Sequence, residues 1–256
     1  MTPFKPNLYV LSWGLYPRRV TIYLKERGIL DRFNVREVPV LPTGLGDLPG
    51  KPKGTVPVLE YEPGRYIRQS SAILEYLEDV SDAAAAAAVN GRNDDNDKCS
   101  HGLRGKTPED RARVRELLDL INEMCSLLGF YLHNASKAFS AAETQSPEAA
   151  GQAFKKVHKL LGDIDSMADA QGPFLAGGGE GSGEGLHRDR PSLADVVMLA
   201  TAQFARHVYD VDLVGGYERL SRSVEAFERR ESGALDEAPA GFRELARQLH
   251  VTILEE

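Results

Sequence analysis

The residues whose types and spacing could do chemistry lie within residues 53–77, KGTVPVLEYEPGRYIRQSSAILEYL. The pattern predicts a short strand beginning near Val56, a tight turn at residues 62–64, a second short strand and a helix that begins near Ser70. Pro57 cannot donate to a sheet ladder, so it belongs at the first residue of a strand, at an edge or at a bulge. The segment therefore predicts a strand–turn–strand–helix unit.

Two features of this unit suit a small peptide ligand. If the Val56–Pro57 bond is cis, the turn leaves the N–H and C=O of Val56 unpaired and facing outward, where an extended peptide can add as a strand. The start of the helix offers free N–H groups, the positive end of the helix dipole and the Ser70 hydroxyl, which suit a carboxylate. Each part alone also has an ordinary structural interpretation, because most X–Pro bonds are trans and a serine before a helix commonly caps it.

The order and spacing of the two motifs favour the functional interpretation. The string GTVPVLE followed by QSSAILEYL resembles the N-terminal, thioredoxin-like domain of the glutathione transferase superfamily. In that family the residue before the cis-proline pairs through its backbone with the cysteinyl part of glutathione, and the pair at the next helix start holds the γ-glutamyl group. The resemblance implies these roles for Val56, Pro57, Gln69 and Ser70. It also makes Lys53 a candidate for the glycyl carboxylate, with a solvated loop lysine as the alternative.

The elements before this unit fit the same arrangement. Residues 8–11 predict a strand, Pro17 and Gly28 open and end a helix, and the alternating FNVREVPV of residues 33–40 predicts a second strand. Proline and glycine dominate residues 41–54, which indicates a loop rather than a regular helix. The order β-α-β, then β-β-α, and the string NLYVLSWGLYPRRVTIYLKERGI both resemble the opening of the glutathione transferases.

The chemistry of that family needs the thiolate form of glutathione. In the family, a hydroxyl just before the first helix lowers the pKa of the thiol, or a cysteine stands in place of that hydroxyl. Counted back from Arg19 and Gly28, the corresponding position holds Gly14. Ser12 and Tyr16 lie two residues to either side and are the candidate catalytic hydroxyls. Backbone N–H groups and the helix dipole are the alternative source of stabilisation. Arg18 and Arg19 are interpreted as a solvated surface pair.

The second substrate is expected between the loop before the first helix and the helix that begins at Thr107. The side chains of Trp13, Tyr16, Phe130 and Tyr131 would make this wall aromatic. An aromatic wall implies a bulky hydrophobic electrophile.

From Thr107 onward the apolar period is helical, which predicts an all-α second half. Capping boxes are predicted at Thr107 with Asp110 and at Ser192 with Asp195. The strings GPFLAG and PSLADV resemble the entry to the buried central helix of the glutathione transferase C-terminal domain, so both members of the second box are expected to be structural. His158 lies at the edge of an apolar stripe and is expected to be packed and hydrogen-bonded rather than catalytic.

Two polar segments interrupt this pattern. The predicted domains are residues 1–82 and 107–256, joined by a linker with an insertion at residues 83–106, whose six alanines could prolong the preceding helix. Residues 81–106 and the glycine-rich residues 172–190 have little to pack and are expected to be mobile. His101 and the acidic residues 94–97 are interpreted as a solvated loop rather than a metal site.

Composition excludes several classes of function. The chain has 256 residues, of which 42% are apolar and 27% charged, as in a soluble globular protein. A net charge of −7 argues against non-specific nucleic-acid binding. No apolar run reaches the length of a membrane span, and the first residues lack a signal-peptide pattern. Cys99 and Cys125 give no disulfide framework, so a cytoplasmic location is expected.

The sequence therefore predicts an α/β thioredoxin-like domain followed by an all-α domain, in a glutathione transferase-like enzyme that forms a homodimer by resemblance and needs no metal. Conjugation of glutathione, the co-substrate, to a hydrophobic small molecule is the first expectation. A glutathione-dependent cis–trans isomerase of an activated alkene, and a non-catalytic binding or regulatory protein with this fold, are the alternatives. The insertions and the aromatic wall also resemble fungal transferases of natural-product pathways.

Overall fold

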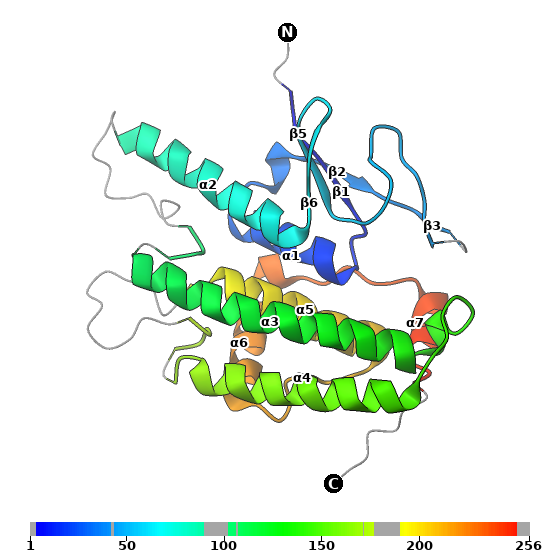
Figure 1. The fold of residues 1–256 in the computed structure, drawn as a ribbon. Coiled ribbons are helices and arrows are strands. Elements are labelled where there is room, and N and C mark those ends of the chain that lie inside the picture. Colours follow the sequence, from blue (N-terminus) through cyan, green and yellow to red (C-terminus); the bar gives the residue numbers. More distant parts are fainter. Residues whose placement is uncertain are drawn as a thin grey trace.

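The structure is a computed structural model that describes residues 4–41, 44–89, 102–105, 107–170, 172–176 and 190–249. In Figure 1 a small sheet with helices α1 (Leu15–Glu26) and α2 (Ser70–Val89) lies against helices formed by the second half of the chain. The predicted order, an α/β thioredoxin-like domain followed by an all-α domain, is therefore confirmed. Helix α2 runs through the alanine-rich segment.

The sheet of the first domain is mixed. Its strand order is β2-β1-β5-β6, with β1 parallel to β2 and the other two pairs antiparallel. The strands are β1 (Asn7–Val10), β2 (Asn34–Glu37), β5 (Val58–Glu62) and β6 (Arg65–Arg68), and a short 3-10 turn, η1 (Leu30–Arg32), precedes β2. The β-α-β and β-β-α units of the sequence prediction are both present.

Strand β1 contributes to two separate apolar layers because successive side chains of a strand point to opposite faces. Leu8 and Val10 are fully buried in the main core, which also contains α1. Tyr9 joins a smaller cluster with Val38 and Val58. This smaller cluster lies beside the loop between β2 and β5.

That loop contains a small hairpin, β3 (Val40–Leu41) with β4 (Gly44–Leu45), and no helix among its described residues. The prediction of a loop at residues 41–54 is thus confirmed for the described part.

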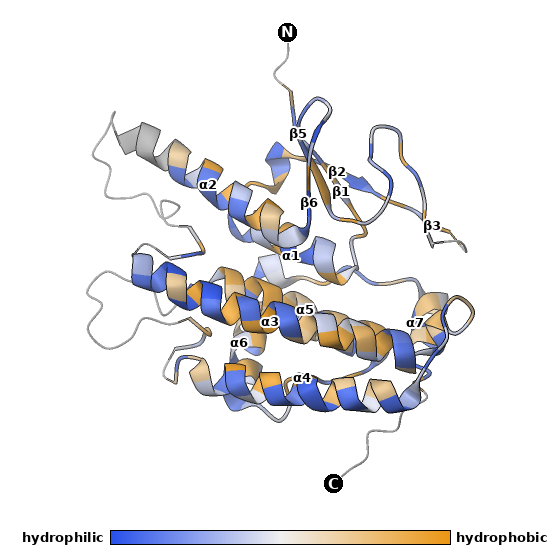
Figure 2. Ribbon diagram, viewed as in Figure 1, coloured by the Kyte–Doolittle hydropathy of each residue, from blue (hydrophilic) through white to orange (hydrophobic). Residues whose placement is uncertain are grey.

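Every regular element that the structure describes in the second half of the chain is a helix. Every residue from 193 to 203 is buried, which makes α5 the central helix, as its all-apolar start predicted. Figure 2 shows hydrophobic and hydrophilic residues alternating along the outer helices, as expected where one side of a helix is buried. The elements are α3 (Pro108–Ala135), η2 (Lys137–Phe139), α4 (Pro147–Met167), α5 (Leu193–Tyr209), α6 (Glu218–Glu228), η3 (Glu231–Gly233) and α7 (Ala240–Ala246).

Both predicted capping boxes are present. The Asp110 N–H donates to the Thr107 hydroxyl (3.1 Å) and the Thr107 N–H donates to the Asp110 carboxylate (3.2 Å), so two backbone donors at the start of α3 are satisfied. Ser192 and Asp195 form the same box at the start of α5. The expectation that this second box is structural agrees with the burial of both residues.

The start of the glycine-rich segment belongs to the core, contrary to expectation. Phe174, Leu175 and Ala176 are each at most 4% exposed. The Leu175 N–H donates to the buried Asp195 carboxylate (2.8 Å), which also accepts from the Ser223 hydroxyl of α6 (2.7 Å). The prediction that residues 172–190 have little to pack is therefore wrong at this end, and residues 177–189 lie outside the described part of the chain.

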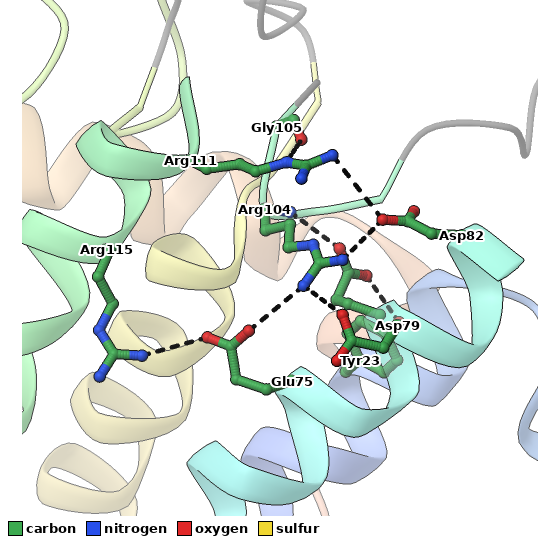
Figure 3. Close-up of polar contacts among 9 residues, drawn as sticks. Tyr23, Glu75, Asp79, Asp82, Arg104, Gly105, Arg111 and Arg115 are labelled. Atoms are coloured by element: carbon green, nitrogen blue, oxygen red, sulfur yellow. Dashed lines mark hydrogen bonds and ion pairs between the residues drawn. The ribbon is translucent and has the colours of Figure 1, made fainter. Parts of the chain in front are cut away.

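Arg104, from the predicted linker, lies against α2 and contacts its acidic side chains (Figure 3). Its guanidinium nitrogens lie 2.7 Å from Asp79, 2.7 Å from Asp82 and 3.6 Å from Glu75, all on α2. Its backbone N–H donates to the Glu78 carboxylate (3.0 Å). We call these five residues the Arg104 clamp.

The clamp is continuous with the packing of both domains. Glu78 is fully buried and accepts a hydrogen bond from the Tyr23 hydroxyl of α1 (2.7 Å). Leu103 is buried, and its C=O accepts from the Leu193 N–H at the start of α5 (2.9 Å). The expectation that residues 81–106 have almost nothing to pack is thus wrong for residues 102–105. The expectations for residues 90–101, including His101, concern residues outside the described part.

Arg104→Met should lower the free energy of unfolding by about 1.5–3 kcal/mol, because it removes hydrogen bonds between charged groups from a side chain that is only 18% exposed. The matched control is Arg111→Met, because Arg111 is 50% exposed and lies 3.9 Å from Asp82. That change should cost less than about 1 kcal/mol. Urea unfolding measures both free energies. Equal losses of stability in the two variants would contradict a stabilising role of the Arg104 clamp.

Candidate functional site

Three segments of the chain meet at one edge of the sheet because of its strand register. β1 and β5 pair Tyr9 with Val58, and β5 and β6 pair Val58 with Arg68. The residues just before β5 therefore lie between those that follow β1 and those that follow β6. This register places Val56 and Pro57 between the beginnings of α1 and α2.

The Val56–Pro57 peptide bond is cis, as the resemblance implied. Pro57 is buried and Val56 is half-buried. Within the described part of the chain, neither the N–H nor the C=O of Val56 forms a backbone hydrogen bond. Both groups of Val56 therefore remain able to pair with an extended ligand.

Gln69 and Ser70 form the start of α2. Gln69 is exposed and has φ +73°, a left-handed conformation that is uncommon for a residue other than glycine and is found preferentially at functional sites. The first helical bond runs from the Ile73 N–H to the Gln69 C=O (3.0 Å), so the N–H groups of Ser70 and the next residues precede the helical ladder. Ser70 itself is 4% exposed. The arrangement is that of an anion site at a helix N-terminus.

The two lysines before Val56 have different environments. Lys51 is buried, and its Nζ donates to the C=O groups of Pro52 (2.9 Å) and Gly54 (3.3 Å) within its own loop. The Lys53 side chain is 90% exposed and lies 4.0 Å from the Asp47 carboxylate. The structure thus places Lys53 in solvent near the candidate site rather than against it.

Gly14 occupies the N-cap of α1, so no side chain caps this helix. Ser12 lies on the far side of β1 from Val56, because its N–H (2.9 Å) and hydroxyl (3.2 Å) both donate to Glu37 at the end of β2. The Tyr16 side chain lies in the first turn of α1, is 43% exposed, and its hydroxyl makes no hydrogen bond to a described residue. Of the two candidate hydroxyls, Tyr16 is the one available to a ligand.

The predicted aromatic wall is divided by the fold. Trp13 is 9% exposed and packs on Phe242 of α7, with ring centroids 5.0 Å apart. Tyr131 is fully buried against Phe154 of α4 (4.4 Å), so it belongs to the core of the helical domain and not to an open surface. Phe130 is 50% exposed and, with Tyr16, remains accessible to a substrate.

The interpretation of Arg18 and Arg19 as a solvated pair is wrong, because each is 1% exposed. Helix α1 packs along α5, α2 and η3, so even its polar positions are covered. Arg18 donates to the Gln203 side chain of α5, and its Nη1 lies 3.6 Å from the Asp236 carboxylate.

His158 is packed and hydrogen-bonded, as predicted. Its Nδ1 lies 2.9 Å from the Tyr217 hydroxyl, and its ring meets Phe154 edge-on. Burial lowers the pKa of His158 below its usual value, which favours the neutral ring. Its partners Tyr217 and Phe154 both lie in the helical half of the chain.

The described residues contain no group of three His, Cys, Asp or Glu side chains that could hold a metal ion. Of the helices within that part of the chain, none is long and apolar enough to cross a membrane.

Comparison with known families finds a match near the beginning of the chain. Residues 13–80 match the family described as glutathione S-transferase, N-terminal domain, a range that begins before α1 and ends within α2. The match covers 68 of the 256 residues, so it shows that this part of the chain is similar to the N-terminal domain of glutathione S-transferases. The match contains the Val56–Pro57 turn and the start of α2, the two features that meet at the sheet edge.

Solved structures share the glutathione transferase fold over nearly the whole chain. Gtt2 from Saccharomyces cerevisiae is 23% identical, with a TM-score of 0.63 over 89% of this chain and 98% of its own. Glutathione transferase Omega 3C from Trametes versicolor is 22% identical, with a TM-score of 0.61 over 93% and 92%. A glutathione transferase family member from Pseudomonas fluorescens, solved with bound glutathione, is 16% identical, with a TM-score of 0.67 over 92% and 100%.

Tyr66→Phe should loosen the loop that leads to Val56. The Tyr66 hydroxyl donates to the Gly50 C=O (2.7 Å), and losing this bond should reduce the local stability of residues 48–54 by about 0.5–1.5 kcal/mol. Amide hydrogen exchange measures this change. Tyr9→Phe is the control, because the Tyr9 hydroxyl donates to Glu60 (3.5 Å) rather than to a C=O of this loop. Equal exchange in the parent protein and Tyr66→Phe would contradict the anchoring role.

Proposed function

We propose that this protein is a glutathione transferase that joins the glutathione thiol to a hydrophobic small-molecule electrophile. One observation carries the proposal. The N–H and C=O of Val56, which form no backbone hydrogen bond within the described part of the chain, lie next to the start of α2 at one edge of the sheet. Such an edge suits an extended peptide that carries a carboxylate. The bound glutathione in the related Pseudomonas fluorescens structure supports the same choice of ligand.

Each part of glutathione has a matching group in this proposal. The Val56 N–H and C=O pair with the cysteinyl residue as an added strand. The γ-glutamyl carboxylate accepts from the Ser70 hydroxyl and from the first N–H groups of α2, where the helix dipole favours negative charge. The Gln69 side chain is exposed beside them and can hydrogen-bond the γ-glutamyl group. Lys53 is the proposed partner of the glycyl carboxylate, and its exposed side chain has to turn toward the ligand to make this contact.

Tyr16 is the proposed donor to the glutathione thiolate. Burial raises the pKa of the Tyr16 hydroxyl, the nearby Cys125 also raises it, and Arg19 lowers it. The hydroxyl is therefore protonated at neutral pH and able to donate to an anion. Its hydrogen bond favours the thiolate over the thiol.

The thiolate sulfur attacks an electrophilic carbon, and a carbon–sulfur bond forms. With an activated alkene the electron pair of the double bond moves to the neighbouring atom, which then takes a proton. With an aryl or alkyl halide the halide leaves with its electrons. We place the hydrophobic substrate beside the exposed rings of Tyr16 and Phe130. A cytoplasmic homodimer is part of the proposal by family resemblance.

Ser70→Ala should weaken glutathione binding about 10- to 150-fold, because a hydrogen bond to a charged group contributes roughly 1.5–3 kcal/mol. Ser71→Ala is the matched control, since Ser71 is the next residue of the same turn and is only half-buried. Its affinity should stay within about a factor of three. Calorimetry measures both. Absence of binding to the parent protein, or equal affinity in parent and Ser70→Ala, would exclude the proposed site.

Isotope-labelled glutathione and an activated enone distinguish conjugation from isomerisation. A conjugating enzyme releases a product that keeps the label. A geometric isomer of unchanged mass, formed only with glutathione present, would instead indicate reversible thiolate addition and would overturn conjugation.

Tyr16→Phe should slow product formation about tenfold or more, and Ser12→Ala should leave it nearly unchanged. Equal rates in Tyr16→Phe and the parent would remove Tyr16 from the mechanism.

A further inference from the structure

Arg19 is a buried cation directly beneath the candidate donor Tyr16. The two residues are three apart on α1, so their side chains are neighbours on one side of the helix. The Arg19 guanidinium carbon lies 4.8 Å from the centroid of the Tyr16 ring, which is cation–π geometry. Arg19 is 1% exposed, whereas Tyr16 is 43% exposed, so one face of the ring rests on the guanidinium.

The partners of Arg19 are unusual for a buried arginine. Its Nη1 donates to the Asn122 side-chain oxygen (2.8 Å) and its Nη2 to the Cys125 sulfur (2.9 Å), both on α3. Its Nε has no partner. No carboxylate of a described residue forms an ion pair with Arg19, whereas the adjacent Arg18 lies 3.6 Å from Asp236. Buried charges are normally paired, so the positive charge of Arg19 is left largely uncompensated.

The contacts beneath Arg19 reach the centre of the helical domain. The Cys125 sulfur lies 3.2 Å from the Thr201 hydroxyl of α5, and that hydroxyl donates to the Val197 C=O (2.7 Å). Cys125 and Thr201 are both buried. A connected series of contacts therefore runs from the Tyr16 ring to the central helix and fixes the guanidinium in place.

We propose that Arg19 is a positioning residue for the Tyr16 hydroxyl, which it holds in place by stacking under the ring and strengthens as a donor through its uncompensated positive charge. This inference rests on the proposed glutathione transferase function. In a poorly solvated environment a nearby cation favours the movement of negative charge onto the phenolic oxygen, so the hydroxyl donates more strongly to an anion.

The balance of charges around Tyr16 agrees with this role. Cys125 on α3 and Arg19 on its own helix are the charged or titratable groups that act on the Tyr16 hydroxyl, and they act in opposite directions. Arg19 lowers the pKa of Tyr16, against the effect of burial. Removal of the cation should therefore weaken the donor even where the ring stays in place.

The test is the titration of the bound glutathione thiol, followed by the ultraviolet absorbance of the thiolate. In Arg19→Met the apparent pKa of the bound thiol should rise by about one unit, and the conjugation rate below that pKa should fall about tenfold. Glutathione affinity should remain within about a factor of three. Arg19→Lys should restore part of the shift, because lysine keeps the charge and loses the planar fork.

A double substitution separates a positioning role from a general structural one. If Arg19 acts through Tyr16, the pair Arg19→Met with Tyr16→Phe should be no slower than Tyr16→Phe alone. Arg115→Met is the matched control, since Arg115 is an arginine of α3 that is 59% exposed and pairs with Glu75 and Asp119 rather than with Tyr16. Its thiol titration should stay close to that of the parent.

The outcomes distinguish the inference from the proposed function. Failure of the parent protein to bind glutathione in calorimetry would overturn the proposed function. Binding by the parent with an unchanged thiol titration in Arg19→Met, or independent effects of the two substitutions, would overturn the role of Arg19 alone. Should Arg19→Met not fold, Arg19→Lys decides, because a smaller shift in the same direction is expected and an unchanged titration contradicts the proposal.

Discussion

Helix α1 has to pack against two domains at once, and the rest of the structure depends on this constraint. From Leu15 to Leu24 every residue except Tyr16 is buried, because α1 packs along α2 of the first domain and along α5 of the helical domain. A helix in this position has no wide solvated side for charged residues. Its two arginines must therefore find partners in the helical domain, and those partners decide how the two halves of the chain fit together.

The two arginines meet this requirement in different ways. Arg18 contacts Gln203 and the acidic Asp236, so its charge is compensated in the usual way. Arg19 is held by an amide and a sulfur, neither of which is a carboxylate, and its charge remains near the only exposed residue of this stretch. The same packing that buries the helix thus places a cation beneath Tyr16. Domain packing and the chemistry of the site are in this way parts of one arrangement.

The sequence predicted what depends on local rules and missed what depends on the contact between domains. The strand–turn–strand–helix unit and both capping boxes follow from residues close together in the chain, and the structure contains all of them. The Val56–Pro57 geometry was predictable from a motif of that kind. The burial of Arg18 and Arg19 was not, because nothing within α1 indicates which of its sides a distant helix will cover. The polar composition around Arg104 wrongly indicated a segment without packing contacts. Its ion pairs with Asp79 and Asp82 on α2 depend on residues that are distant in the sequence.

The absence of a side-chain donor at Gly14 is best understood from the geometry of the first turn of α1. A Cβ at Gly14 would lie 3.2 Å from the Leu11 C=O and 3.4 Å from the Pro17 ring, so this N-cap has little room for a side chain. A donor must then come from a residue that points away from the crowded turn. Tyr16 does so, but an exposed aromatic ring on a helix has few contacts to fix it. The guanidinium beneath it supplies such a contact. In the proposed mechanism Tyr16 supplies from within the helix the donor that the N-cap residue lacks, and the buried cation next to it strengthens that donor.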